Sequence, residues 1–254
     1  KELNNFPDRE LNLRKVKRYE LYKVMWYRTD LWIHSRRVAW IVEEIGPVAK
    51  KVLGDAFDEE RAVALALVHD DAEILFGDIQ AGNKAKMSAE ELQKIKELER
   101  DAIKSLTKQY PTKISNYNYR ELLIESLDKK SLEAMVVNWA DKYDAFCEAL
   151  HEIYAGHKAW TVQVENKYGR IDLPTDHYIK YFNSFESKFP RARELFREEN
   201  RWFSIPKEPK VFEIVNKHGE HTKESIKIPK NYLPYDQWVA LTIRNRDEED
   251  ITNL

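Results

Sequence analysis

Apolar residues recur at every third or fourth position over much of the chain, which is the period of amphipathic helices. Between residues 12 and 109 this pattern is clearest in two sets: Val38, Ile41, Val42 and Ile45, and then Leu92, Ile95, Leu98, Ile103 and Leu106. The run over residues 62–68 differs, because it is apolar on every face. The helix predicted over residues 61–76 is therefore expected to be buried among other helices.

Turn residues divide this helical pattern into segments. Glycine, proline and polar clusters predict loops at Gly46-Pro47, at residues 77–83 and at residues 110–118. Further helices are predicted over residues 120–155 and 175–199. The pattern therefore predicts an all-α bundle over residues 1–200.

Beyond that bundle the pattern changes. Two β-prone segments, 211–215 and 225–228, flank a turn at 217–219, and an apolar stretch follows over 238–243. We expect residues 201–254 to form a C-terminal extension that contains a short β-hairpin and packs on the helical core.

Composition restricts the partners of the protein. The 254 residues include 42 Lys and Arg against 44 Asp and Glu, a net charge of −2, so no overall positive field attracts a nucleic acid polymer. The longest apolar run, 62–68, is far shorter than the roughly 20 residues that span a bilayer, so we expect no membrane association. The single cysteine, Cys147, allows no intrachain disulfide, and no signal-like segment opens the chain, which favours a cytoplasmic protein.

Ionisable residues directly follow the buried run. His69 and Asp70 would be costly there unless a partner such as a bound cation compensates them. Glu73 lies four residues after His69 and three after Asp70, so in a continuous helix all three side chains share one side. Gly77 is expected to end that helix and bring Asp78 back toward the same end.

Two more candidate ligands lie on other predicted helices. His34 precedes Val38 and Ile41 on one apolar face, and Asp141 lies in an inward-facing row between Val137 and Ala145. Either residue alone would usually be structural. Two imidazoles and two carboxylates together suit one divalent ion (Mn, Co, Fe, Zn or Mg), with its identity left open.

The residues that follow Asp141 could form a second polar row, but an exposed helix face is the more common arrangement. Asp144, Glu148 and His151 continue along the same predicted helix at positions that we expect to form an exposed helix face.

Three stretches carry a family resemblance: His34-Ser35 with Val38-Ala39, residues 67–78 with His69-Asp70, Glu73 and Gly77-Asp78, and residues 139–142 with Asp141. This pattern resembles that of HD-domain phosphohydrolases and, more narrowly, of the YfbR-type 5'-deoxynucleotidase group. The likeness covers residues 14–200 and includes Arg18-Tyr19. It departs at Ile33, where the group has a glutamate, and at Asn138, where it has a lysine.

The resemblance implies a role for each matching residue. The metal ligands would be His34, His69, Asp70 and Asp141. Glu73 would orient or deprotonate water or protonate the leaving oxygen, and Asp78 would help to hold substrate or water. The substrate would be bound by Arg18 and Lys84 at its phosphate, with Arg28 as the competing phosphate binder, and by Tyr19 near the sugar.

The resemblance thus implies an HD-domain bundle that removes the 5'-phosphate from deoxyribonucleoside monophosphates and forms a homodimer or higher homo-oligomer. Two alternatives stay open. One is an HD-type deoxynucleoside triphosphate triphosphohydrolase with nearly the same ligands. The other is a catalytically idle HD-fold module that binds a nucleotide or a protein, with residues 201–254 as its docking element.

Overall fold

The computed structural model describes residues 6–19, 29–79, 84, 87–155, 165–166, 169–170, 174–196, 213–215, 221–225 and 233–250. The chain divides into two compact units. The first contains residues 1–21 and 27–141, and the second contains residues 22–26 and 142–254. The boundary predicted at residue 200 stays a prediction.

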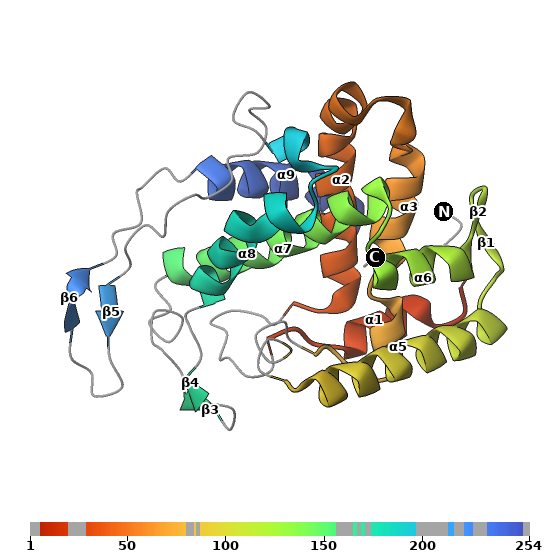
Figure 1. Cartoon of the computed structure of the whole chain (residues 1–254), viewed down its shortest axis with the longest axis horizontal. Coiled ribbons are helices and arrows are strands. Elements are labelled where there is room, and N and C mark those ends of the chain that lie inside the picture. The colour runs from red at the N-terminus through yellow and green to blue at the C-terminus, as the bar shows by residue number, and fades with distance from the viewer. Residues whose placement is uncertain are drawn as a thin grey trace. The chain divides into compact units, whose positions relative to one another are not determined.

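Helices form most of the described chain, which confirms the all-α prediction (Figure 1). The α-helices are α1 (Arg9–Lys15), α2 (Leu31–Leu53), α3 (Glu59–Val68), α5 (Ala89–Gln109), α6 (Tyr119–Asp128), α7 (Leu132–Tyr154), α8 (Pro174–Lys188) and α9 (Leu233–Asp250). Shorter 3-10 helices are η2 (Gly54–Ala56), η3 (Asp71–Ile74) and η5 (Arg193–Phe196).

The strands form three antiparallel pairs. These are β1 (Lys113–Ile114) with β2 (Tyr117–Asn118), β3 (Glu165–Asn166) with β4 (Gly169–Arg170), and β5 (Glu213–Val215) with β6 (His221–Ser225). The last pair is the hairpin expected in the C-terminal extension.

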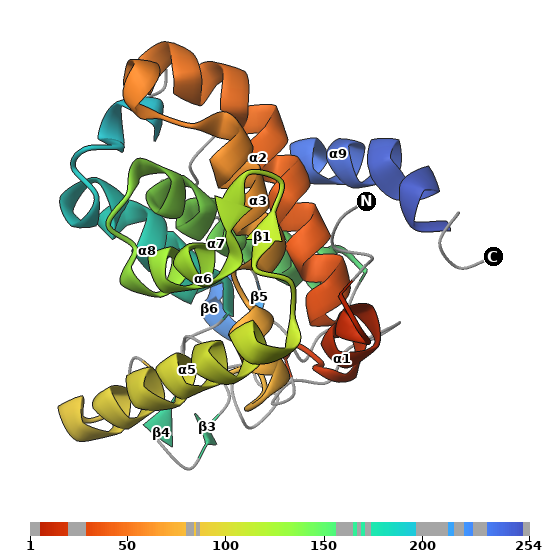
Figure 2. The ribbon, with the colours of Figure 1, turned by 90° about the vertical axis from the view of Figure 1, so that its right-hand side faces the viewer.

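Helices α2 and α3 lie side by side and form the centre of the first unit (Figure 2). The inward face of α2 is the predicted one, because Val38, Ile41, Val42 and Ile45 are all buried. In α3 the apolar run is buried at Ala62, Leu65, Ala66 and Val68. The two predicted core helices therefore pack against each other.

The loop predicted at Gly46-Pro47 is wrong, because both residues lie inside α2. Pro47 removes one helix hydrogen bond, but the fully buried side chains of Ile45 and Ala49 on either side hold the helix together by packing. Gly46 has a packing role: a Cβ there would collide with the side chain of Glu59 at the start of α3.

The helix predicted over residues 61–76 is also wrong in its extent. α3 ends at Val68, residues 69 and 70 form a turn, and η3 follows. The reversal expected at Gly77 is present, because Gly77 has a φ of 83° and its N–H bonds to the carbonyl oxygen of Glu73 at 2.7 Å.

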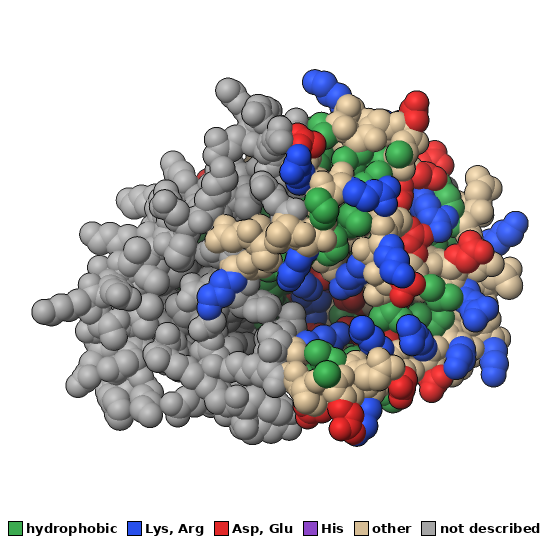
Figure 3. Space-filling view, in the orientation of Figure 1, with side chains coloured by type: hydrophobic (Ala, Val, Ile, Leu, Met, Phe, Trp, Pro, Cys, Tyr) green, Lys and Arg blue, Asp and Glu red, His purple; other side chains and the backbone are tan. Residues whose placement is uncertain are grey.

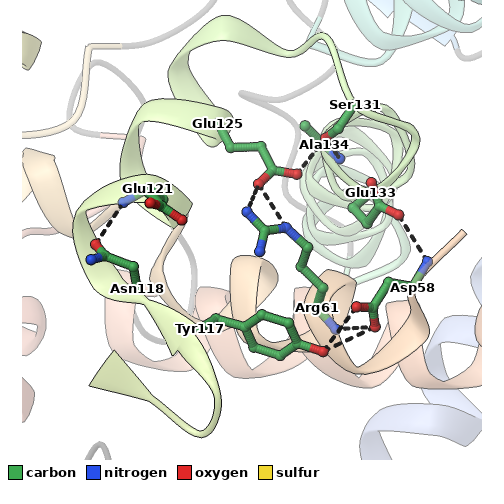
Figure 4. A network of polar contacts seen from close by, with 9 residues as sticks. All are labelled: Asp58, Arg61, Tyr117, Asn118, Glu121, Glu125, Ser131, Glu133 and Ala134. Atoms are coloured by element: carbon green, nitrogen blue, oxygen red, sulfur yellow. Dashed lines mark hydrogen bonds and ion pairs between the residues drawn. The ribbon is translucent and has the colours of Figure 1, made fainter. Parts of the chain in front are cut away.

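A polar network fixes the beginning of α3 to α6 and α7 (Figure 4). The Asp58 side chain accepts a hydrogen bond from the N–H of Arg61 at 3.0 Å, as an N-cap, and also accepts from the Tyr117 hydroxyl. Arg61 pairs with Glu125 of α6, and the Asp58 N–H donates to Glu133 of α7 at 2.8 Å. Three helices are thereby joined at one end of α3.

In the second unit, α9 packs on the C-terminal half of α7. The indole N–H of Trp238 donates to Oδ1 of Asp144 at 2.7 Å, and the Tyr143 hydroxyl donates to the carbonyl oxygen of Pro234 at 2.7 Å. The Cys147 thiol is fully buried and lies 3.6 Å from the same Pro234 oxygen.

This packing corrects the expectation of an exposed face after Asp141. Asp144 is 0% exposed and Glu148 is 8% exposed, and the ring of His151 hydrogen-bonds the Tyr235 hydroxyl through Nδ1 at 2.9 Å. The helix period alone could not reveal that a helix almost a hundred residues later covers this row.

On the face shown in Figure 3, the described part of the chain carries Lys and Arg side chains as well as Asp and Glu side chains. Among the described residues, the structure contains no helix that is long and apolar enough to span a membrane.

The Trp238–Asp144 hydrogen bond gives a prediction about stability. The Trp238→Phe variant keeps most of the aromatic volume but removes the donor to a carboxylate that is 0% exposed. We expect its free energy of unfolding to fall by about 1–3 kcal/mol, measured by urea denaturation. Ile243→Ala on the same helix, at a side chain that is 65% exposed, should change it by less than about 0.5 kcal/mol. Equal effects of the two variants would contradict this role.

Candidate metal centre

His34 is placed by the first turn of α2. Asp30 caps this helix, because its side chain accepts a hydrogen bond from the N–H of Ile33 at 3.2 Å, and Lys17 pairs with Asp30 at 3.0 Å. The first helical hydrogen bond runs from the N–H of His34 to the carbonyl oxygen of Asp30 at 3.1 Å. The imidazole is therefore set one turn into the helix, and its side chain is 0% exposed.

His69 and Asp70 lie in the turn that follows α3. Nδ1 of His69 is 2.7 Å from the carbonyl oxygen of Ala66, so this nitrogen carries the proton and donates it. Nε2 of His69, on the other side of the ring, is buried without a hydrogen bond in the described part of the chain. An imidazole held in this way is typical of a metal ligand.

The ligand atoms of His34, His69 and Asp70 all lie within 4.8 Å of one another. Oδ2 of Asp70 lies 3.5 Å from Nε2 of His34 and 3.2 Å from Nε2 of His69. The two rings stand edge to face with their centroids 5.3 Å apart. Three of the four predicted ligands therefore converge on one small volume, although they come from α2 and from a turn.

Asp141 completes the predicted set from α7. Its Oδ1 lies 3.3 Å from Nε2 of His34, and the residue is 9% exposed. Two imidazole nitrogens and two carboxylates are a donor set suited to a divalent transition ion. Since Nε2 of His69 is a buried polar atom without a hydrogen bond among the described residues, the donor set fits such an ion.

Asp70 and Glu73 have opposite electrostatic environments. Burial alone would raise the pKa of Asp70, but His69 and His34 beside it hold that pKa well below its ordinary value. Burial, together with the charges of Asp70 and Asp78, raises the pKa of Glu73 well above its ordinary value, against the opposing effect of Lys84 and Arg18. The carboxyl of Asp70, a predicted ligand, is thus ionised, while Glu73 favours its protonated form.

Arg18 and Tyr19 adjoin the centre. Nη1 of Arg18 lies 3.8 Å from Oδ2 of Asp70, and the guanidinium carbon lies 5.5 Å from the centre of the Tyr19 ring. The Arg18 N–H bonds to the carbonyl oxygen of Thr29 at 2.9 Å, and Tyr19 adopts a φ of 55°. The structure thus places Arg18 next to the predicted ligand Asp70, and Tyr19 next to Arg18.

The other predicted residues are only partly located. Lys84 pairs with Glu99 of α5 at 3.1 Å, and although burial lowers its pKa, Glu99 and Glu73 raise that pKa above its ordinary value. Asp78 is half-buried and its charge acts on Glu73. Arg28 lies outside the described residues.

The expectation that His69, Asp70 and Glu73 share one face of a continuous helix is wrong. The helix ends before His69, and Glu73 belongs to the separate helix η3. The three groups still act on one another, since the charge of Asp70 raises the pKa of Glu73 and His69 contacts Asp70.

A buried polar cluster behind this turn has no counterpart in the sequence prediction. Nε and Nη2 of Arg9 donate to the two oxygens of Asp71 at 2.8 and 2.6 Å, and the Tyr119 hydroxyl donates to Asp71 at 2.8 Å. The charged pair is 2% and 0% exposed. The one local sequence signal for this cluster is Asp71, an acidic residue directly after Asp70. Arg9 gives no local signal, because it is 62 residues away in sequence.

Comparison with known proteins identifies relatives of this arrangement. A family model described as 5'-deoxynucleotidase YfbR-like matches residues 8–188. A 5'-deoxynucleotidase from Vibrio vulnificus is 28% identical over 161 residues, covering 61% of this chain and 79% of its own length. The 5'-deoxynucleotidase YfbR of Salmonella typhi is 25% identical over 149 residues, covering 59% of this chain and 73% of its own.

Solved structures show the same fold. A conserved hypothetical protein from Pyrococcus furiosus matches with a TM-score of 0.54 at 22% identity, over 77% of this chain and 96% of its own. An HD-domain phosphohydrolase from Listeria innocua matches with a TM-score of 0.51 at 18% identity, over 75% of this chain and 84% of its own.

The helical bundle with paired histidines and Asp70 at its centre defines an HD-domain protein. Because the family model spans residues 8–188 of 254, the chain belongs to the YfbR-like 5'-deoxynucleotidase family.

The raised pKa of Glu73 gives a prediction about pH. A carboxyl whose folded-state pKa exceeds its unfolded value stabilises the fold while it is protonated, and this stabilisation is lost as pH rises from the ordinary value of 4.5 toward the folded-state pKa. In protein treated with chelator, Glu73→Gln should therefore lose less thermal stability than the native chain as the pH is raised above 4.5. Thermal unfolding at several pH values measures this, and parallel curves would contradict it.

Proposed function

We propose that this protein is a metal-dependent phosphohydrolase that removes the 5'-phosphate from deoxyribonucleoside monophosphates. The observation that carries the proposal is the convergence of His34, His69 and Asp70, with Asp141 beside His34. The names of its relatives from Vibrio vulnificus and Salmonella typhi support the choice of substrate.

His34, His69, Asp70 and Asp141 would hold a single divalent ion, and the mixed nitrogen and oxygen donors suit Mn, Co, Fe or Zn, with Mg also possible. Such an ion would activate water and polarise the phosphoryl group. His69 is oriented for this by its bond to Ala66, and the negative charge of Asp70 is kept by the two histidines.

Arg18 would bind the phosphate. The residue is 8% exposed and its guanidinium group already lies beside Asp70, so a phosphate in contact with Arg18 would adjoin the metal centre. Lys84 would add a second positive charge, with Arg28 as a further candidate. Tyr19, next to Arg18, would line the sugar, where an aromatic side chain can exclude a 2'-hydroxyl.

Glu73 would transfer a proton. Hydrolysis forms a bond from the water oxygen to phosphorus and breaks the bond from phosphorus to the 5'-oxygen, which then needs a proton. Glu73 favours its protonated form, so it can donate to the leaving oxygen and then take up the proton that the attacking water releases, and Asp78 can hold substrate or water nearby. The resemblance also suggests a homodimer or higher homo-oligomer, and the single cysteine favours a cytoplasmic setting.

The first test concerns the metal. Asp70→Asn keeps the size of the side chain but removes the charge that pairs with both histidines. We expect bound metal to be lost and kcat to fall at least about 100-fold, because even changes behind a metal ligand cost about 10–100-fold. Metal analysis and phosphate release from paired deoxy- and ribonucleoside mono- and triphosphates, with added Mn²⁺ or Co²⁺, measure this.

The product of the native chain decides between the alternatives. Orthophosphate from deoxyribonucleoside monophosphates would support the proposal, whereas triphosphate from deoxynucleoside triphosphates would favour the triphosphohydrolase. Unchanged activity of Asp70→Asn would refute the metal mechanism, and a metal-free native protein inactive on every substrate would favour a binding module.

The second test concerns the phosphate. Arg18→Lys keeps the positive charge but loses the planar fork, so kcat/KM should fall about 10- to 100-fold, as expected for lost charge-assisted hydrogen bonds. Arg14→Lys is the matched control, because Arg14 pairs with Glu10 on α1 and its side chain is 29% exposed. Steady-state kinetics measures both, and an equal loss in the two variants would argue against a phosphate site at Arg18.

A further inference from the structure

The segment that carries His69 and Asp70 is held from behind by hydrogen bonds from two other helices. Nη2 of Arg9 in α1 donates to the carbonyl oxygen of Leu67 at 2.5 Å, and the Ser126 hydroxyl of α6 donates to the carbonyl oxygen of His69 at 3.1 Å. Arg9 also forms the two bonds to Asp71. Arg9 therefore bridges the residues on both sides of the two predicted metal ligands.

The cluster is closed to water. Arg9 and Asp71 are 2% and 0% exposed, and Tyr119, which donates to Asp71, is also fully buried. The Tyr119 ring packs edge to face on Phe6, with the centroids 5.2 Å apart. The carboxylate of Asp71 thus receives three hydrogen bonds inside the core and has no freedom to reorient.

The ion pair between Arg9 and Asp71 fixes the orientation of the groups that it joins. Apolar side chains of the same volume would fill the core as well as a buried ion pair, because the desolvation cost offsets most of the attraction. The two parallel hydrogen bonds from the Arg9 guanidinium group instead fix the direction of the Asp71 side chain. The hydrogen bond from Arg9 to the carbonyl oxygen of Leu67 fixes the backbone at Leu67. Residues 68–70 lie between Leu67 and Asp71, so fixing these two residues also restricts the positions of the three between them.

We propose that Arg9, Asp71 and Tyr119 are positioning residues for the metal centre. They hold the turn after α3 so that the His69 ring and the Asp70 carboxylate meet His34 at the observed distances. None of the three would touch the metal or the substrate. This inference rests on the proposed metal-dependent function.

The other end of α3 supplies matched controls. Arg61 pairs there with Glu125 of α6, as Arg9 pairs with Asp71, and the Tyr117 hydroxyl donates to Asp58, as the Tyr119 hydroxyl donates to Asp71. Asp71→Asn is therefore compared with Glu125→Gln, and Tyr119→Phe with Tyr117→Phe. Each comparison sets a variant at the ligand end of α3 against one of the same chemistry at the opposite end.

The experiment measures the dissociation constant of Mn²⁺ by titration calorimetry, together with the thermal unfolding midpoint of each metal-free variant. Asp71→Asn should weaken Mn²⁺ binding about 10- to 100-fold. Tyr119→Phe, which loses one hydrogen bond and keeps the ring, should weaken it about 2- to 10-fold. Both controls should bind Mn²⁺ within about twofold of the native chain, whatever loss of midpoint they show. Saturating Mn²⁺ should restore most of the activity of Tyr119→Phe.

Unchanged Mn²⁺ affinity in Tyr119→Phe and Asp71→Asn would overturn the inference while leaving the proposed function intact. Equal losses of affinity in the controls would overturn it as well, because the effect would then follow stability alone. If Asp71→Asn does not fold, the Mn²⁺ affinities of Tyr119→Phe and Tyr117→Phe alone test the inference. Failure of the native chain to bind Mn²⁺ or Co²⁺ would overturn the proposed function and this inference with it.

Discussion

The end of α3 inside the protein is the constraint on which the site depends. A helix that stops in the core leaves carbonyl groups without helical partners, and each of them needs a donor. At this end the carbonyl oxygen of Ala66 accepts a hydrogen bond from the His69 ring, and that of Leu67 accepts one from Arg9. The same bonds that satisfy the helix end therefore orient one predicted ligand and anchor the segment that carries the next.

Two carboxyl groups three residues apart acquire opposite proton affinities in this setting. Asp70 lies between two imidazoles, so its pKa falls, while Glu73 is buried near two other carboxylates, so its pKa rises. This separation is what a hydrolytic site requires, because one group has to stay charged while another holds a proton. Short 3-10 geometry at η3, in place of a continuing α-helix, allows the two side chains to enter different environments.

The helix periodicity and the motif residues predicted which side chains form this site, but they did not predict where the backbone of α3 ends. The helix period gave His34 and Asp141 their inward direction, and the motif residues proved close in space. The end of α3 was not predictable, because Ala62 to Val68 favours a helix and Gly77 is the first helix breaker that follows. Arg9, whose bonds hold the turn, is distant in sequence and carries no local signal. The buried row at Asp144 escaped prediction for the same reason, since Trp238 covers it from far along the chain.

The packing of α9 on α7 has a consequence for the chemistry of the one cysteine in the chain. Cys147 is fully buried beneath Pro234, and burial raises the pKa of its thiol well above its ordinary value. Alkylating reagents react with the thiolate form of cysteine. The folded packing therefore protects this sulfur twice, because it excludes the reagent and because it disfavours the thiolate. Alkylation of the native protein therefore proceeds only through openings that separate α9 from α7, and its rate measures how often those openings occur. The sequence thus contains its own reporter for local unfolding of the second unit, with no other thiol to confuse the signal.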